Sequence, residues 1–302
     1  MKISARDNRK RLPTFGITHK GAGMRSLLSA GVLWAAMLCP AFAQTTAASP
    51  LRLYALDCGR LQFTDLGPFA DTGEYDGKPG TFMASCFLIR HARGDLLWEA
   101  GLGDHYAGQR EGVQLPLYRA FVPISLESQL HSLGINFADI EYFAFSHGHG
   151  DHLGNAARLT SSTWLINNRE LAWLEASPPP PRTNPQYVGH RDRSRSVMIN
   201  GDHDVFGDGS VRILSTPGHT PGHQVLLLSL VNSGAIILSG DLFHSRENRA
   251  GRRLPVFNSD RAATLASMDR VESILRNRRG RLVIQHSIED FMALPKFPAF
   301  LD

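Results

Sequence analysis

Cysteine is scarce in this chain, with three residues among 302. No two of them have the close spacing of a thiolate zinc site, so a zinc finger or a related structural zinc domain is excluded. Cys39 lies in an apolar segment near the amino terminus, which leaves Cys58 and Cys86 in the remainder of the chain. Both stand in apolar, strand-like stretches. A disulfide formed in an oxidising compartment and a pair of buried free thiols both fit these two positions.

The chain also lacks an apolar run long enough to cross a bilayer comfortably. The stretch MRSLLSAGVLWAAMLCPAFA begins at Met24, has an apolar part from Leu27 to Leu38, and ends on a small-x-small pattern at Ala43. This arrangement is typical of a secretory signal peptide, and we expect cleavage near Ala43.

This interpretation also determines what we expect of the residues before and after the signal peptide. Residues 1–23 are basic and have no evident structural role. A start codon assigned too early and an extended positive region of the signal peptide both account for them. We expect residues 44–302 to form a single domain that works in the periplasm or outside the cell.

An excess of basic charge is missing from this expected mature chain. Residues 1–43 hold seven of the 32 Lys and Arg residues and one of the 28 Asp and Glu residues, so residues 44–302 carry 25 bases and 27 acids. The formal charge of +4 for the whole chain therefore becomes −2. Such a balance does not favour nucleic acid, or an anionic membrane, as a partner. We expect a small-molecule partner instead.

Strand-like and helix-like patterns alternate from residue 125 onward, which predicts an α/β fold. Residues 125–134 and 261–277 predict helices, and residues 151–159 predict the start of another. Residues 82–101 predict a β-hairpin.

Two segments carry no regular pattern. Residues 104–124 are irregular, and residues 178–204 are polar and rich in Pro and Arg. The second segment is long enough to predict a functional lid, in which His190 and His203 could contact a substrate.

Three histidines and an aspartate fall within six consecutive positions of the stretch FAFSHGHGDHLGN, directly after an apolar run. His147 and His149 project to the same side where strand geometry continues, and Asp151 and His152 follow at once. A single histidine more often has a capping or hydrogen-bonding role. The cluster as a whole indicates a metal site.

Further metal-binding side chains occur where other apolar stretches end. His219 follows a predicted strand, Asp241 closes AIILSGD, and His286 closes RLVIQH. The carboxyl ends of strands are where open α/β sheets place their sites, so we expect these side chains to meet the first cluster. The full set of candidate ligands is His147, His149, Asp151, His152, His219, Asp241 and His286.

Imidazoles and carboxylates without thiolates favour zinc, with iron, manganese and cobalt as other candidates. Seven ligands exceed the three or four that one zinc ion needs, which predicts two zinc ions that share a carboxylate. Two ions roughly 3.5–4 Å apart lower the pKa of a water between them toward about 7. A non-catalytic zinc-binding protein is the alternative of another class, although such a protein needs no open coordination position.

The motif SHGHGDH, followed in order by PGHTPGH, SGD and QHS, resembles the metallo-β-lactamase superfamily, whose signature is H-x-H-x-D-H followed by His, Asp and His. The resemblance runs from the first predicted strand to His286 and implies an αβ/βα sandwich with the metals in a groove at one edge. It also implies that one metal is held by His147, His149 and His219, that the other is held by Asp151, His152 and His286, and that Asp241 bridges the two.

Within the superfamily, the stretches STPGHTPGHQVLLL and GDLFHSRENRAGRRLPVF are most similar to N-acyl-homoserine lactone lactonases, which open the rings of quorum-sensing signals. The positions of Cys58 and Cys86 resemble that group as well. The resemblance implies a dinuclear hydrolase in which a metal-bridging hydroxide attacks the lactone carbonyl and Asp151 passes a proton to the departing alkoxide. Quorum quenching is the function that it predicts.

Two positions depart from the resemblance. His244 stands where those lactonases carry a substrate-binding tyrosine, and we expect it to donate a hydrogen bond or to shuttle a proton; a plain surface position is the alternative. Glu99 stands where the superfamily usually has Asp, which implies a small shift in the groove. His223 is expected to support a ligand by hydrogen bonding.

Other hydrolases of the superfamily stay open as alternatives. A metallo-β-lactamase shares the export and the first motif, but those that resemble it generally lack a carboxylate equivalent to Asp241. A promiscuous esterase or thioesterase would show the same metal ligands. Trp164, Trp173 and Tyr187 could line an acyl pocket, although core packing is the more common use of such residues. The sequence leaves the oligomeric state open, a homodimer included.

Overall fold

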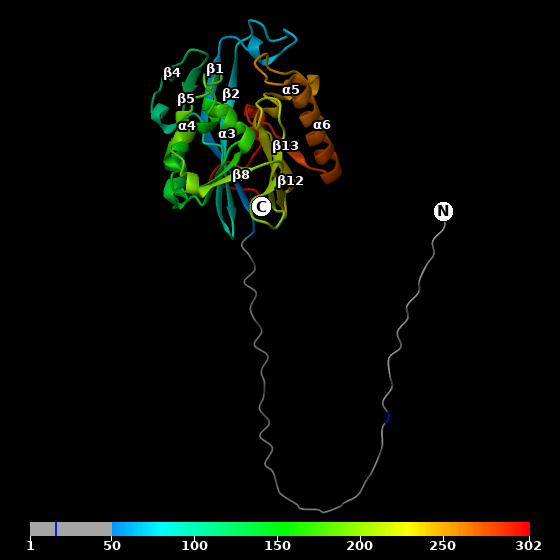
Figure 1. Ribbon diagram of the computed structural model, residues 1–302. Coiled ribbons are helices and arrows are strands. Elements are labelled where there is room, and N and C mark those ends of the chain that lie inside the picture. The colour runs from blue at the N-terminus through cyan, green and yellow to red at the C-terminus, as the bar shows by residue number, and fades with distance from the viewer. Residues whose placement is uncertain (1–15, 17–49) are drawn as a thin grey trace, which may run out of the picture. The chain divides into compact units, whose positions relative to one another are not determined.

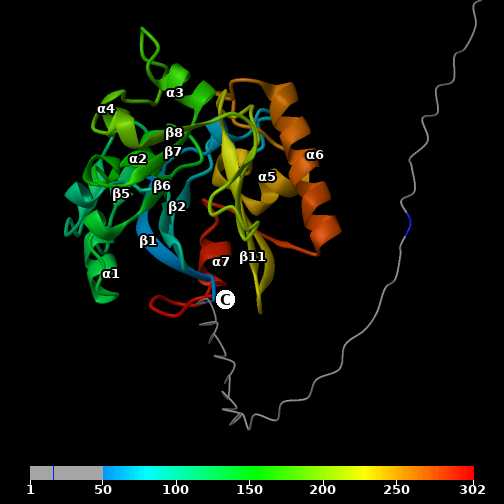
Figure 2. The ribbon, with the colours of Figure 1, turned by 60° about the horizontal axis from the view of Figure 1, so that its bottom comes forward.

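Two β-sheets lie face to face in this protein, and helices pack on the outer face of each sheet (Figure 1, Figure 2). The computed structural model describes residue 16 and residues 50–302. The expected signal peptide, residues 24–43, lies outside the described residues. Among the residues described, no helix combines the length and the apolar character needed to span a membrane.

The first sheet has eight strands in the order β4-β5-β1-β2-β3-β6-β7-β8. Its strands are β1 (Arg52–Phe63), β2 (Gly80–His91), β3 (Gly94–Trp98), β4 (Val113–Gln114), β5 (Arg119–Phe121), β6 (Tyr142–Ala144), β7 (Thr163–Asn167) and β8 (Ser196–Ile199). Strands β2 and β3 form the predicted antiparallel hairpin, whereas β3, β6, β7 and β8 run parallel. The loops that follow β6 and β7 therefore leave the sheet at the same edge.

The second sheet has five strands in the order β13-β12-β11-β10-β9. Its strands are β9 (His203–Asp204), β10 (Val211–Ser215), β11 (Gln224–Leu230), β12 (Gly234–Leu238) and β13 (Arg281–Val283). Strand β11 is antiparallel to both β10 and β12, and β13 is parallel to β12. The loops after β10, β12 and β13 consequently emerge together.

The helices lie on both outer faces, apart from the last one, whose Phe291 packs against the core between the sheets. They are α1 (Leu126–Ser132), α2 (Gly150–Leu153), α3 (Asn168–Leu174), α4 (Gln186–Gly189), α5 (Arg246–Gly251), α6 (Arg261–Arg278) and α7 (Ile288–Met292). The hydroxyl oxygen of Ser125 caps α1 by accepting the N–H of Ser128 at 3.1 Å. Helix α6 packs Met268 and Val271 against the second sheet.

The side chains of β1 alternate between the two faces of the sheet, so this strand contributes to two hydrophobic cores. Leu53 and Ala55 point between the sheets, while Tyr54 and Leu56 point toward α1 and its neighbours. Successive side chains of a strand face opposite sides, so a strand covered on both sides is apolar at almost every position. The predicted αβ/βα sandwich is confirmed.

A disulfide joins the first two strands. Cys58 of β1 and Cys86 of β2 are bonded, with their Cα atoms 5.8 Å apart, and both are buried against α1 and its neighbours. Of the two arrangements that the sequence left open, the structure contains the bridge.

The helix predicted over residues 151–159 is much shorter than expected. Helix α2 ends at Leu153, and a separate 3-10 turn, η4 (Ala156–Arg158), follows. The N–H of Gly154 donates to the carbonyl of Gly101 at 2.7 Å instead of continuing the helix. A Cβ at Gly154 would lie 2.1 Å from the carbonyl carbon of Leu102, so only glycine permits this close approach.

The segment 178–204, predicted as an irregular lid, contains regular structure as well. It includes α4, β8 and β9, and β8 pairs in parallel with β7 at the edge of the first sheet. An edge strand has one neighbour and can leave side chains in solvent, as Val197 and Met198 are here. The apolar pattern of a buried strand is therefore missing from its sequence. The short strands β4 and β5 likewise interrupt the segment expected to be irregular.

Candidate metal centre

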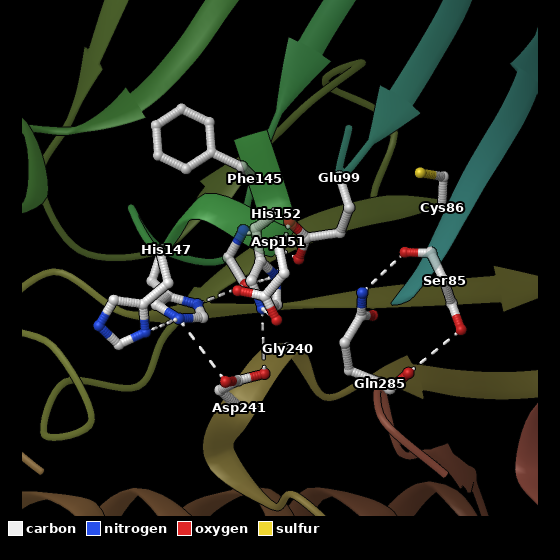
Figure 3. Close-up of polar contacts among 12 residues, drawn as sticks. Ser85, Cys86, Glu99, Phe145, His147, Asp151, His152, Gly240, Asp241 and Gln285 are labelled. Carbon is white, nitrogen blue, oxygen red and sulfur yellow. Dashed lines mark hydrogen bonds and ion pairs between the residues drawn. The ribbon is translucent and has the colours of Figure 1, made fainter. Parts of the chain in front are cut away.

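All seven predicted ligands meet at one edge of the sandwich, where the loops after β6, β10, β12 and β13 converge. Figure 3 labels His147, Asp151, His152 and Asp241 of this set. Asp241 belongs to a 3-10 turn, η6 (Gly240–Leu242), that follows β12. The histidines of the set are buried, and Asp151 is partly exposed at the surface of a cavity.

One group forms around Oδ2 of Asp241. This oxygen lies 3.6 Å from Nε2 of His147 and 3.5 Å from Nε2 of His219. Nδ1 of His149 lies 2.8 Å from the same nitrogen of His147 and 3.2 Å from that of His219. Three imidazole nitrogens and one carboxylate oxygen thus point at a common centre.

A second group forms around the other oxygen of the same carboxylate. Oδ1 of Asp241 lies 3.3 Å from Nε2 of His152 and 3.0 Å from Nε2 of His286. Oδ2 of Asp151 lies 3.7 Å from the former nitrogen and 3.6 Å from the latter. Asp241 therefore presents one oxygen to each group.

These distances fit divalent cations. Ligand atoms about 2.0–2.2 Å from a tetrahedral zinc ion are separated from one another by roughly 3.3–3.6 Å. Nε2 of His152 and Oδ1 of Asp241 are buried without a hydrogen-bond partner, although they lie only 3.3 Å apart. Buried polar atoms are normally satisfied, so a cation between these two atoms accounts for their arrangement.

The charges in the two groups suit cations as well. Burial lowers the pKa of His147 and of His219 well below the usual value, and it lowers the pKa of His149 to about 4. Neutral imidazoles with free lone pairs result. Burial also acts to lower the pKa of His152, but the carboxylates of Glu99 and Asp241 outweigh it and raise that pKa well above its usual value. Those carboxylates favour a positive charge, which a cation can supply.

A close contact between two loops fixes the position of Asp241. Gly240 has a φ of +50°, and a Cβ on it would lie 2.3 Å from Cβ of Ser146. Only glycine lets the turn after β12 lie this close to the loop after β6. The backbone N–H of Asp241 donates to Nε2 of His223 at 3.1 Å, which gives His223 the supporting role expected from the sequence.

Glu99 lies next to His152 of the second group (Figure 3). Its Oε2 lies 3.2 Å from Nδ1 of His152, and its Oε1 accepts the N–H of Ser146 at 3.1 Å. Glu99 is fully buried and has a φ of +70°, a strained value for a residue with a side chain. The position where the superfamily usually has Asp is thus occupied here by a glutamate that contacts a candidate ligand directly.

His286 is oriented by the first sheet, although it follows a strand of the second. Its Nδ1 lies 2.7 Å from the carbonyl oxygen of Met83. The neighbouring Gln285 donates from Nε2 to the carbonyl of Ser85 at 2.7 Å and accepts the hydroxyl of Ser85 at its own carbonyl at 3.1 Å (Figure 3). These bonds hold the two sheets together beside the ligands.

Glu170 is a buried residue that the sequence did not single out. Its Oε1 accepts the N–H of Gly148 at 2.8 Å, between two histidines of the first group. Its Oε2 accepts the hydroxyl of Thr220 at 2.7 Å and the N–H of Gly222 at 2.9 Å, in the loop that carries His219. Burial raises the pKa of Glu170 to about 7, although these hydrogen bonds act to lower it. In the sequence this glutamate is simply an acid in the first turn of a helix, which gives no signal of the role.

A cavity of about 270 Å³ opens over the ligands. Its polar floor includes His149, Asp151, Asp241, His244 and His286. Apolar side chains dominate its walls: Leu61, Phe63, Phe69, Phe82, Leu102, Leu115, Leu117 and Phe257. A substrate with one polar, reactive end and one apolar end matches this division.

His244 is a buried residue that lines this cavity, so the alternative of a plain surface position is wrong. Its Nε2 lies 3.2 Å from Oδ2 of Asp241. Its ring lies against Phe69, with the two centroids 5.2 Å apart, and is stacked on His286 with the centroids 5.6 Å apart. Packing on two sides fixes the imidazole at the boundary between the ligands and the apolar wall.

The other residues expected to contact a substrate differ in whether they line the cavity. Tyr187 lines the cavity, as does Arg182, another residue of the predicted lid. Trp164 is fully buried in the core between the first sheet and its helices, and Trp173 packs against the same core. His190 and His203 are not among the residues that line the cavity.

Comparison with known proteins agrees with the fold and with the ligand motifs. The sequence model of the family described as "Metallo-beta-lactamase superfamily" matches residues 79–286. The chain therefore belongs to the metallo-β-lactamase superfamily, as its motifs predicted.

Several relatives carry one kind of name, and solved structures share the fold. N-acyl homoserine lactonase AttM of Azorhizobium caulinodans is 26% identical over 264 residues, which cover 83% of this chain and 99% of that protein. A structure of an N-acyl homoserine lactone hydrolase with the product N-hexanoyl-L-homoserine bound at its catalytic metal centre has a TM-score of 0.71 at 24% identity, over 83% of this chain and 98% of that one. AidC, a dizinc quorum-quenching lactonase, has a TM-score of 0.62 at 18% identity, over 83% and 89% of the two chains. The predicted resemblance to this group is confirmed.

Proposed function

We propose that this protein is an exported, dinuclear lactonase that opens the ring of N-acyl homoserine lactones and thereby quenches quorum-sensing signals. The observation that carries the proposal is the carboxylate of Asp241. One of its oxygens faces His147 and His219, and the other faces His152 and His286. Asp241 and His286 themselves line the floor of a cavity with apolar walls. The relatives named N-acyl homoserine lactonase that align with 83% of the chain supply the substrate class.

Two divalent metals fit the site, and we assign seven side chains to them. One would be held by His147, His149 and His219, the other by Asp151, His152 and His286, and Asp241 would bridge the two. We infer zinc, because the set consists of imidazoles and carboxylates. When bound, two such ions supply Lewis acidity toward a carbonyl oxygen and a water with a pKa near about 7.

The protein's own side chains would bind and orient the lactone. The apolar walls would take the acyl chain and exclude water from it. Nε2 of His244 reaches the boundary between wall and floor, where it can donate a hydrogen bond to a substrate oxygen. Oδ2 of Asp151 faces two histidines, which leaves Oδ1 to hold a proton and pass it to the departing ring oxygen.

The export belongs to the proposal and has two supports. Residues 24–43 read as a signal peptide, and the chain contains the disulfide Cys58–Cys86. Disulfides persist in the periplasm and outside the cell and are rare in the reducing cytosol. Fractionation of cells that express the whole chain tests this part: activity and the processed chain should appear outside the cytoplasm.

A substrate panel tests the activity. The purified protein is assayed by pH-stat with N-hexanoyl homoserine lactone, aliphatic lactones, aryl esters, nitrocefin and S-lactoylglutathione, and its metal content is measured in parallel. We expect about two metals per chain and the highest kcat/KM for the acyl homoserine lactone. Turnover of nitrocefin alone would refute the lactonase. A single tightly held ion without any turnover would favour the non-catalytic zinc protein.

A further inference from the structure

The cavity contains one charged side chain for which the proposed function has no use so far. Among the residues that line the cavity, Arg182 is the single Lys or Arg. It lies between α3 and α4, in the segment that follows the four prolines 178–181. Its position on the wall places a cation above a floor of histidines and carboxylates.

The side chain of Arg182 is held in place, but among residues 50–302 no carboxylate forms an ion pair with it. Its guanidinium carbon lies 3.5 Å from the centroid of the Phe257 ring, in cation–π geometry. Its backbone has a φ of +65°, a value that a residue with a side chain rarely adopts. Within residues 50–302 its side chain forms no hydrogen bond and no ion pair. Arg191, which lies in the same segment of the chain, is by contrast paired with Glu175 at 2.8 Å.

A half-buried guanidinium with unused N–H groups favours an oxygen acceptor. Phe257 covers one face of the group, so its N–H donors, which lie in the plane, remain available to whatever enters the cavity. Divalent ions held at the floor would supply Lewis acidity toward the ring carbonyl of a lactone. In an N-acyl homoserine lactone the amide is attached to the carbon next to that carbonyl, so a second oxygen lies close to the first.

We infer that Arg182 is a specificity-determining residue, which donates a hydrogen bond to the amide carbonyl oxygen of the acyl homoserine lactone. The inference rests on the proposed function and adds to it the feature that separates acylamino lactones from plain alkyl lactones. The contact exists in the bound substrate and persists during ring opening, so its loss raises KM and leaves kcat nearly unchanged.

Two lactones and four proteins test this role. N-hexanoyl homoserine lactone is compared with an α-alkyl γ-butyrolactone of matched chain length, which has the same ring and lacks the amide. The native protein is compared with Arg182→Met, which keeps an apolar stem over Phe257, and with Arg182→Lys, which keeps the charge. Arg193→Met is the matched control, because Arg193 lies in the same segment with its side chain 81% exposed and does not line the cavity.

For Arg182→Met we expect KM for the acyl homoserine lactone to rise about 10- to 100-fold, the range for one lost charged hydrogen bond. KM for the alkyl lactone should stay within about twofold, the metal content should be unchanged, and Arg182→Lys should fall between the two. Equal losses on both lactones, or no loss on either, would overturn the role of Arg182 while leaving the lactonase intact. If the native protein opens neither lactone, it is the proposed function that fails.

Discussion

Oε2 of Glu170 accepts the hydroxyl hydrogen of Thr220 at 2.7 Å, and both residues are buried. The other oxygen of the same carboxylate accepts the N–H of Gly148. One side chain thus ties the loop of His147 and His149 to the loop of His219. The three histidines of the first group come from two sheets, and Glu170 hydrogen-bonds to both loops that carry them.

Replacing Glu170 by Ala should therefore weaken metal binding without removing a ligand. Three hydrogen bonds disappear, and the two loops lose their shared partner. Loss of such an outer partner typically lowers metal affinity about 10- to 100-fold. Competition with a chromophoric chelator measures the change. Glu111→Ala, at an exposed position, is the control; an equal affinity in both variants would contradict the role of Glu170.

The raised pKa of Glu170 makes its contribution to stability depend on pH. Its pKa in the folded protein is about 7, against 4.5 for the ordinary carboxyl group. Because the folded protein then holds a proton that the unfolded chain releases, the contribution of Glu170 to the free energy of unfolding falls as pH rises from about 4.5 to about 7.

Glu170→Gln isolates this effect, because glutamine does not titrate. The variant should be less stable than the native protein at pH 5, and the difference should shrink by pH 8, by at most about 3 kcal/mol for a shift of this size. Urea unfolding of both metal-free proteins at the two pH values measures it. A difference that grows with pH would show that the carboxylate is held ionised by its hydrogen bonds.

Asp241 should be indispensable for keeping both metals, since each of its oxygens faces a different group. Asp241→Asn keeps the shape of the side chain but replaces one oxygen by an NH₂ group, which cannot bind a cation. We expect metal content to fall from about two per chain to one or fewer, and turnover to fall at least about 1,000-fold, because several kcal/mol of transition-state stabilisation are lost. Elemental analysis after gel filtration gives the first number. Two retained metals would exclude a bridging role.

The convergence of the seven candidate ligands could be predicted from the sequence. So could the places of His223 and His244 beside them, whereas those of Glu170 and Arg182 could not. His147, His149 and Asp151 follow one apolar strand at close spacing, and His219, Asp241 and His286 each follow another, so residue type and position both carry the signal. The parallel and antiparallel pairing of these strands then brings their ends to one edge.

Glu170 and Arg182 have no comparable pattern. Glu170 contacts residues 22 and 52 positions away, and nothing in its neighbours along the chain records those partners. Arg182 derives its role from Phe257, which lies in a loop packed against it from the other half of the molecule. Strand β8 was missed for a related reason, because an edge strand needs only its neighbour β7 and no apolar alternation of its own.

Substitutions of His244 test whether its imidazole donates a hydrogen bond to the substrate. His244→Phe removes the imidazole donor while keeping a ring against Phe69, so metal content should stay at about two and turnover should fall about 100-fold. His244→Tyr restores a donor at the same place and should recover most of the loss. Unchanged kinetics in His244→Phe would leave the imidazole with a packing role alone, and loss of a metal would make it a ligand.

The disulfide between β1 and β2 should contribute to stability through the unfolded chain. It closes a loop of 28 residues, for which the chain-entropy treatment gives about 3.6 kcal/mol. The double variant Cys58→Ala/Cys86→Ala should therefore unfold at a lower urea concentration with a similar slope, and the same measurement under reducing conditions should bring the native protein close to it. Neither cysteine lines the cavity, so kcat/KM of the folded variant should remain within about twofold. Equal urea midpoints for the oxidised and reduced native protein would mean that the disulfide adds no stability to that of the paired strands.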